Sequence, residues 1–154
     1  MREVFWLIPD RVAGRPGPDR VPWDLAAMRE AGIGAVLSVN DGLLCHPEDF
    51  AAVGIHYACI PLSENAPPQP GDDALCLRAL PQAHAFVREQ LRNDRRTVVH
   101  CSSGKDRTGL YLAYHWMQEA GASAEAAIAH VRRIRPIAFT AWGWDEHALH
   151  VLAR

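Results

Sequence analysis

Hydrophobic and polar residues follow two periods along this chain, one typical of strands and one typical of helices. Short apolar runs rich in β-branched residues predict strands over residues 4–8, 35–39, 55–60 and 97–99. Apolar residues at helical spacing predict helices over residues 23–30, 47–52, 72–91, 110–117, 123–134 and 140–152. Strands and helices therefore alternate in the first two thirds of the chain, and three helices end it.

Proline, glycine and capping residues set the expected boundaries. Residues 11–22 hold two glycines and three prolines, which predicts an irregular loop. Pro81 lies inside a helical stripe and is expected to kink that helix or split it in two. Ser123 and Thr140 are the expected N-caps of the last two helices, and Pro136 prevents continuation of the first of these.

The order of these elements predicts an α/β fold, with a central mixed β-sheet flanked by helices on both faces. The chain has 154 residues, of which 49% are hydrophobic, so we expect one domain over residues 1–154. Open α/β sheets bind ligands at the carboxyl ends of their strands. The carboxyl end of the strand at 97–99 is therefore the expected position of a site.

Composition and charge exclude several classes of function. The net charge of −2 gives no general attraction to nucleic acid or to anionic membranes. The four cysteines form no C-x-x-C pair, so we expect neither a metal site nor a disulfide framework, and no cofactor. No apolar run is long enough for a membrane span, and residues 1–9 lack the apolar region of a signal peptide. We expect a cytoplasmic monomer.

The candidate chemistry lies in residues 100–109, HCSSGKDRTG, between the last predicted strand and a buried helix. A strand-to-helix turn of this kind points backbone N–H groups into one concavity at the positive end of the helix dipole. Such a nest binds a phosphate or a similar anion. The residues expected to line it are Ser102, Ser103, Gly104, Lys105, Asp106 and Arg107.

Cys101 and Arg107 enclose five residues, so the loop is able to wrap once around a tetrahedral anion. The guanidinium fork of arginine binds two phosphate oxygens at once. The same N–H groups and helix terminus favour the thiolate form of Cys101, which makes it a candidate nucleophile. The Thr108 hydroxyl is placed to hydrogen-bond the sulfur, and His100 is expected to fix the loop backbone rather than to act as a base.

This segment resembles the phosphate-binding loop, HC-x5-R-[ST]-G, of the cysteine-dependent protein tyrosine phosphatase superfamily, in particular its small dual-specificity branch. The resemblance implies a dual-specificity phosphatase-like fold and hydrolysis of phosphoric monoesters through a phosphocysteine. It implies phosphoproteins as substrates. Lys105, the single lysine beside fifteen arginines, adds a second class, because Cys-x-x-Gly-Lys-x-Arg loops occur in members that act on phosphoinositides or inositol phosphates.

The residue at the usual position of the general acid departs from the pattern of that superfamily. The position after Ile60-Pro61 is often Asp in relatives but is Leu62 here. Glu64, three residues before Pro67-Pro68, is one candidate acid, and Asp106 in the phosphate loop is the other.

Three alternatives remain open. A phosphatase-like module with weak or no turnover would use the same loop to bind a phospho-ligand. Sulfurtransferases and arsenate reductases also place a cysteine in an anion loop, although Arg107-Thr108-Gly109 fits phosphatases better. Oxidation would form a protective disulfide between Cys101 and Cys45 or Cys59 if either lies close enough.

Overall fold

A five-stranded sheet with strand order β1-β2-β5-β3-β4 forms the centre of the molecule in the computed structural model, which describes residues 2–154. β1 pairs antiparallel with β2, and every other pairing is parallel, so the predicted mixed sheet is confirmed. The strands are β1 (Phe5–Ile8), β2 (Val12–Arg15), β3 (Ile33–Ser38), β4 (His56–Cys59) and β5 (Arg96–His100). The helices are α1 (Leu25–Glu30), α2 (Pro47–Ala52), α3 (Asp72–Arg92), α4 (Asp106–Ala120), α5 (Ala124–Ile134) and α6 (Trp144–Leu152).

β5 is the central strand, and its position fixes the start of the phosphate loop. Val98 of β5 lies opposite Ala13 on one side and Val36 on the other. Residues 97–100 are all buried, which agrees with the continuous β-branched run expected of a strand covered on both faces. The chain leaves the sheet at His100, so residue 101 lies at the carboxyl edge of the sheet.

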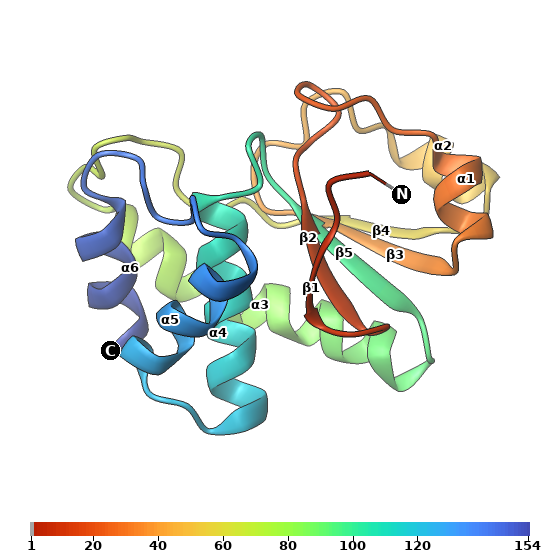
Figure 1. The fold of residues 1–154 in the computed structure, drawn as a ribbon. Helices are drawn as coiled ribbons and strands as arrows, with labels where there is room; N and C mark the ends of the chain where they lie inside the picture. Colours follow the sequence, from red (N-terminus) through yellow and green to blue (C-terminus); the bar gives the residue numbers. More distant parts are fainter. Residues whose placement is uncertain (1) are drawn as a thin grey trace.

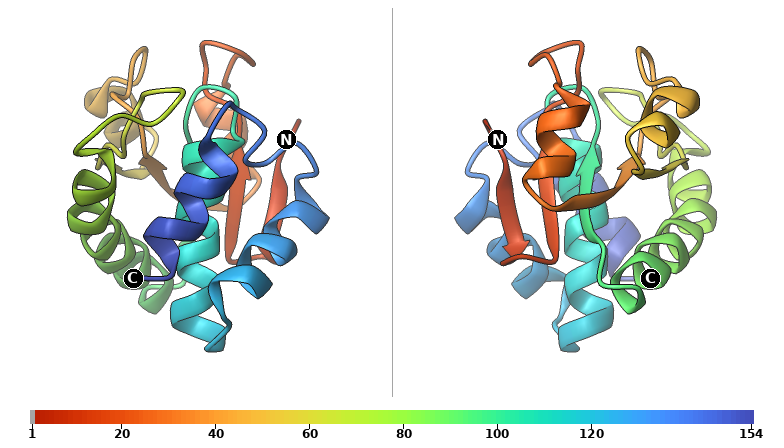
Figure 2. Two further views of the ribbon diagram at one scale, coloured as in Figure 1. Left: turned by 90° about the vertical axis from the view of Figure 1, so that its left-hand side faces the viewer. Right: turned by 90° about the vertical axis from the view of Figure 1, so that its right-hand side faces the viewer.

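Helices cover both faces of the sheet, as Figure 1 and Figure 2 show. On one face α1 and α2 bury a small cluster that includes Met28, Phe50 and Val98. On the other face α3 and α4 cover the sheet, and α5 and α6 pack against α4. The larger core forms there around Val99, Leu110 and other apolar side chains. The predicted layers of helices on both faces are confirmed.

The expectation that residues 11–22 form an irregular loop is wrong for the segment that forms β2. Residues 12–15 are buried and pair with β1 on one side and β5 on the other. Gly14 is required there, because a Cβ atom would lie 2.3 Å from the Phe5 ring. Long-range pairing therefore outweighs the local signal of the glycines and prolines. Residues 16–22 remain irregular.

The structure also differs from the predictions inside α3 and at the start of α6. Pro81 does not divide α3, which runs over 21 residues with the exposed proline inside it. Thr140 does not cap α6, whose N-cap is Gly143, because the Thr140 hydroxyl instead donates to the backbone oxygen of Ile137 at 2.7 Å. Ser123 caps α5 as predicted by accepting from the N–H of Ala126.

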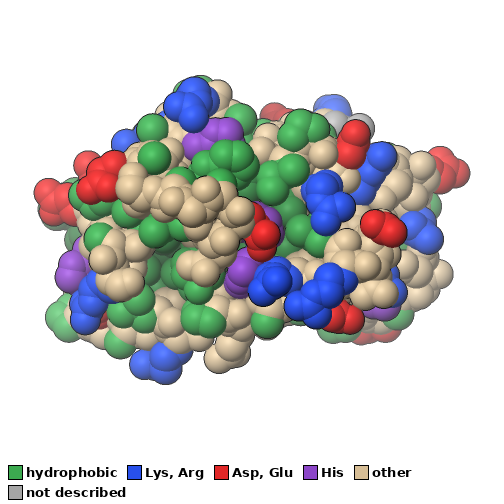
Figure 3. All heavy atoms as spheres, turned by 90° about the horizontal axis from the view of Figure 1, so that it is seen from below, with side chains coloured by type: hydrophobic (Ala, Val, Ile, Leu, Met, Phe, Trp, Pro, Cys, Tyr) green, Lys and Arg blue, Asp and Glu red, His purple; other side chains and the backbone are tan. Residues whose placement is uncertain are grey.

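Charges of both signs are interspersed on the surface. Figure 3 shows the face seen from below in Figure 1, where arginines alternate with carboxylates and apolar side chains. Within residues 2–154, no helix has the length and apolar character needed to cross a membrane.

Candidate active site

The phosphate loop joins the carboxyl end of β5 to the first turn of α4. Cys101 follows β5 directly and is 2% exposed. α4 begins at Asp106, four residues before the predicted helix, so the amino terminus of the helix reaches into the loop itself. Gly104 has a φ of 66° and lies so close to the backbone of Arg15 that a Cβ atom would come within 2.7 Å of it. Only glycine fits this turn without a shift of the backbone.

The carbonyl groups of the loop point outward and are bound by neighbouring elements. The N–H of Gly17 donates to the oxygen of Ser102 at 2.8 Å. Arg135 donates through Nη2 to the oxygen of Ser103 at 2.7 Å and through Nε to that of Gly104 at 3.1 Å. Within residues 2–154, no acceptor takes the N–H groups of residues 102–105. The loop therefore offers unpaired donors beside the buried thiol, which is the arrangement of an anion nest.

Arg107 supplies one further unpaired donor next to the loop. Its Nη1 donates to the backbone oxygen of Glu64 at 3.2 Å, which ties the first turn of α4 to the loop over residues 61–71. Its Nε is buried and has no hydrogen-bond partner among the described residues. A buried donor without a partner is costly, and an anion oxygen would satisfy it.

Thr108 and Cys101 are in contact as the sequence predicts. The Thr108 side chain is completely buried, and its Oγ1 donates to the Cys101 Sγ at 3.1 Å. This hydrogen bond stabilises negative charge on the sulfur.

Lys105 and Asp106 contact each other and the segment that follows α5. The Lys105 Nζ donates to the Thr140 hydroxyl at 2.9 Å and lies 3.4 Å from the Asp106 carboxylate. The other Asp106 oxygen accepts from the N–H of Ala141 at 3.5 Å. Both side chains are mostly buried, so they brace the loop against residues 137–143.

His100 is an internal support of the loop. Its Nδ1 lies 2.9 Å from the Cys101 carbonyl oxygen, which only accepts, so Nδ1 carries the proton and donates. Nε2 then accepts from the Ser38 hydroxyl, which in turn accepts from the Tyr57 hydroxyl at 2.6 Å. Burial lowers the pKa of His100 to about 4, so the ring is neutral at neutral pH. This geometry agrees with the structural role expected of His100.

The loop over residues 61–71 holds Glu64 at the surface between two anchored neighbours. Ser63 is buried, with its hydroxyl 3.3 Å from the Cys76 sulfur. The backbone oxygen of Asn65 accepts from Trp144 Nε1 at 2.9 Å. The Glu64 carboxylate itself is exposed and makes no hydrogen bond with a described residue. Leu62 is 1% exposed and belongs to the core, which explains why a carboxylate is absent there.

Asp72, in the first turn of α3, closes the loop that precedes the helix. Gly71 is the N-cap of α3, and the Asp72 carboxylate is buried. It accepts from the backbone N–H of Gln69 at 2.7 Å and from the Asn65 amide, so it closes the loop over residues 61–71.

Sequence reasoning missed two arginines that support the site. Arg135 donates to two carbonyls of the phosphate loop, and its Cζ lies 4.9 Å from the Phe5 ring centroid. Arg15, 3% exposed, donates to the carbonyl oxygens of Pro16, Val21 and Pro22, which shapes the segment beside the loop. The one available signal for Arg135 was its position at a helix end directly before Pro136.

The four cysteines are free. The Cys45 sulfur lies 3.6 Å from the His100 Nε2, and the Cys59 thiol donates to the backbone oxygen of Asn40. Burial raises the pKa of both thiols, so neither is activated as a nucleophile. A disulfide of either one with Cys101 remains a prediction.

Comparison with known proteins agrees with this geometry. The family described as "Dual specificity phosphatase, catalytic domain" matches residues 21–144. The tyrosine-protein phosphatase cdcA of Emericella nidulans is 30% identical over 121 residues, which cover 78% of this chain and 19% of the relative. The phosphatidylglycerophosphate phosphatase PTPMT1 of Arabidopsis thaliana is 26% identical over 117 residues, 75% of this chain and 33% of the relative. This chain thus spans about a fifth to a third of these relatives.

Solved structures give the same fold. The crystal structure of Tk-PTP in its active form superposes with a TM-score of 0.80 and 19% sequence identity, and the match covers 99% of this chain and 98% of that one. The family match spans most of the chain and includes the complete phosphate loop. The chain therefore belongs to the dual-specificity phosphatase catalytic-domain family, a branch of the cysteine-dependent protein tyrosine phosphatase superfamily.

Proposed function

We propose that this chain hydrolyses phosphoric monoesters through a phosphocysteine on Cys101. The observation that carries the proposal is the buried Arg107 Nε, which has no partner within residues 2–154 and belongs to the residue that follows a loop with unpaired N–H groups. A bound phosphoryl group supplies acceptors for all of these donors at once. The nucleophile lies at the base of the same loop.

In the first step the Cys101 thiolate attacks phosphorus in line with the leaving oxygen. Arg107 and the loop N–H groups stabilise the charge on the equatorial oxygens. A carboxylic acid donates its proton to the departing alkoxide or phenoxide, so the leaving group departs as an alcohol or phenol. The S–P bond forms as the P–O bond breaks, and phosphocysteine remains.

In the second step water attacks the phosphocysteine and releases inorganic phosphate. The carboxylate that gave up its proton now accepts one from the water. The S–P bond breaks and the electron pair returns to the sulfur, where the hydrogen bond from Thr108 stabilises the thiolate. The chemistry uses only side chains of this chain and water.

Glu64 is our choice for the general acid, with Asp106 as the alternative. The Glu64 carboxylate is exposed and unengaged, while its own backbone oxygen is bonded to Arg107, which keeps the residue beside the phosphate position. The Asp106 carboxylate already contacts Lys105 and the N–H of Ala141. A proton donor must be free to reach the leaving oxygen, and this favours Glu64.

The substrate class includes phosphoproteins and phosphoinositide or inositol phosphates. Trp142 and Ile137 are 78% and 47% exposed on the segment that braces Asp106, so apolar surface is available beside the site. The two relatives described above act, by their names, on phosphotyrosine and on phosphatidylglycerophosphate, which supports a phosphoprotein and, more generally, a phospholipid monoester as substrate. A reducing cytoplasmic setting belongs to the proposal, because the nucleophile must stay a free thiol.

Phosphate release tests the proposal. We would assay an aryl phosphate, phosphotyrosine and phosphoserine peptides, and phosphoinositides with the wild type and Cys101→Ser. Activity that disappears in Cys101→Ser supports the enzyme, and the panel names the substrate class. Thiosulfate and arsenate are assayed alongside to separate sulfur transfer and arsenate reduction from phosphatase chemistry.

A phospho-ligand binding module is the second candidate function, because buried Leu62 replaces the carboxylate common in relatives. Binding of a phosphopeptide or phosphoinositide without turnover by the wild type would overturn the enzyme proposal and favour the binding module.

A further inference from the structure

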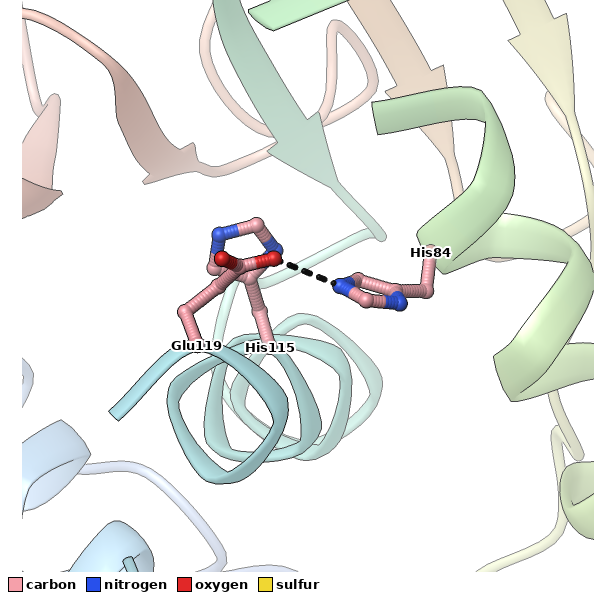
Figure 4. A group of neighbouring side chains, drawn as sticks. All are labelled: His84, His115 and Glu119. Atoms are coloured by element: carbon pink, nitrogen blue, oxygen red, sulfur yellow. Dashed lines mark hydrogen bonds and ion pairs between the residues drawn. The ribbon is translucent and has the colours of Figure 1, made fainter. Parts of the chain in front are cut away.

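A second cluster of chemically competent side chains lies between α3 and α4, away from the phosphate loop (Figure 4). His84 projects from α3 toward α4, and His115 and Glu119 project from α4 toward it. One ligand atom from each of the three side chains lies within 4.8 Å of the others. His115 and Glu119 are four residues apart in one helix, so they share a face.

His115 carries the feature that needs explanation. The residue is completely buried, and its Nδ1 lies 3.0 Å from the Tyr111 hydroxyl. Its Nε2 is buried and has no hydrogen-bond partner among the described residues. Buried polar atoms of native proteins are nearly always satisfied, so an atom left over next to a histidine and a carboxylate indicates a missing partner.

We propose that His84, His115 and Glu119 bind a divalent metal ion of the Zn²⁺ type that joins α3 to α4. Two imidazoles and one carboxylate form a donor set that zinc accepts, with water in the fourth position. The Glu119 side chain is 41% exposed, so water has access. Mg²⁺ and Ca²⁺ prefer sites made of oxygen ligands, so this set selects against them.

The present geometry is close to that of a bound site. The His84 Nε2 lies 3.0 Å from the Glu119 Oε1, a bond that the ion replaces with two metal–ligand bonds. Tetrahedral ligands about 2.1 Å from one zinc ion lie about 3.4 Å apart, so ligand atoms now up to 4.8 Å apart must approach by as much as about 1.4 Å, which rotation of the side chains supplies. The Tyr111 hydroxyl lies 3.0 Å from the His115 Nδ1, and in the tautomer with the proton on Nδ1 it accepts from that N–H and leaves Nε2 free for metal.

The neighbouring groups agree with this role. Burial lowers the pKa of His115 to about 4, so the ring is neutral at neutral pH and available as a ligand. Two arginines among the described residues, Arg11 and Arg88, act on the cluster through their charge. The Arg88 side chain is 53% exposed, and its Nε lies 3.8 Å from the Glu119 Oε1. A partly solvated arginine at this distance is a weak competitor for the carboxylate.

The metal site is separate from the proposed phosphatase chemistry. His115 follows Arg107 by eight residues in α4, which corresponds to about 12 Å along the helix axis. α3 and α4, which supply the ligands, cover the large core. The phosphate loop lies at the amino end of α4. We therefore expect the ion to stabilise the fold without touching the substrate.

Metal titration of the full chain tests the proposal. The parent for the test is Cys101→Ser, which removes the reactive thiol as a competing ligand. We expect it to bind one equivalent of Zn²⁺, measured by equilibrium dialysis with elemental analysis, and to gain thermal stability when zinc is added. His84→Gln and Glu119→Gln in this parent should each weaken zinc binding more than about tenfold. The matched control is His56→Gln, an exposed histidine on β4 that should leave binding unchanged.

Circular dichroism of each variant without metal shows whether it is folded, so that lost binding is not confused with unfolding. Cobalt substitution adds a second readout, because Co²⁺ bound by three such ligands and water has a visible spectrum that the His84→Gln variant should lack. Equal zinc binding by the His84→Gln/Glu119→Gln double variant and its parent would overturn the proposal, because the ion would then lie at other groups such as Cys45 and Cys59. Absence of saturable zinc binding by the parent would overturn it as well.

Discussion

The Thr108 hydroxyl donates a hydrogen bond of 3.1 Å to the Cys101 sulfur, and both side chains are buried at the point where β5 gives way to α4. The bond is made to a sulfur whose charge changes in each proposed step. Because the thiolate is the leaving group of the second step, the bond should matter most for breakdown of the phosphocysteine.

We therefore predict that Thr108→Val lowers kcat about 10- to 100-fold, since a hydrogen bond to a charged group is lost. The phosphocysteine should then accumulate, and rapid mixing with an aryl phosphate should show a burst of phenol followed by slow turnover. Thr108→Ser, which keeps the hydroxyl, is the matched control and should retain most of the activity. A Thr108→Val variant with no burst and normal kcat would show that the hydroxyl does not assist this step.

Arg135 should be required for tight binding of the phosphoryl group, although it lies outside the loop. Its two hydrogen bonds hold the carbonyls of Ser103 and Gly104 outward, and this keeps the N–H groups of the loop directed inward. We predict that Arg135→Met lowers kcat/KM about 10- to 100-fold and weakens inhibition by inorganic phosphate in parallel. Arg133→Met on the same helix is the control, because Arg133 is exposed and contacts His130. Equal effects of the two substitutions would point to general charge rather than to loop support.

Local patterns predicted most of the elements because their signals lie within a few residues. The β-branched run Thr97-Val98-Val99 and the apolar stripe of α5 each follow a single hydrophobic period. Both elements form as expected. β2 was missed because its stability comes from pairing with Phe5 on one side and with β5, more than eighty residues later, on the other. The glycines and prolines around it gave the opposite local signal.

In the candidate site, too, residues that lie close together in the sequence were easier to predict than residues that lie far apart in it. The phosphate loop is one contiguous segment, so Cys101, Arg107 and Thr108 were predicted together from the sequence. Arg135 was missed because its partners lie about thirty residues earlier in the chain, and its own position before Pro136 does not indicate which atoms it binds. The general acid stays a prediction for the same reason, since the position of Glu64 depends on the conformation of a proline-rich loop.

The two candidate acids should respond differently to the leaving group. A general acid matters most when the leaving oxygen is strongly basic, as in phosphoserine or inositol phosphates, and least for p-nitrophenyl phosphate. We predict that Glu64→Gln lowers kcat about 10²- to 10⁴-fold on the basic leaving groups and much less on p-nitrophenyl phosphate. Asp106→Asn should mainly raise KM, because Asp106 braces the loop through Lys105 and Ala141. The reverse pattern would identify Asp106 as the acid.

Acid should destabilise the fold through His100. Its pKa is about 4 in the folded protein because of burial, against about 6.5 in an unfolded chain. Between these values the unfolded state binds more protons, so the free energy of unfolding falls as pH drops from about 6.5 toward 4, by up to about 3 kcal/mol from this residue. His115 contributes in the same direction, so the slope of unfolding free energy against pH should become shallower in His100→Asn but not vanish.

Urea unfolding at a series of pH values measures this slope for wild type, His100→Asn and the exposed control His56→Gln. An unchanged slope in His100→Asn, with a shallower one in His56→Gln, would show that the buried ring is not the group that titrates.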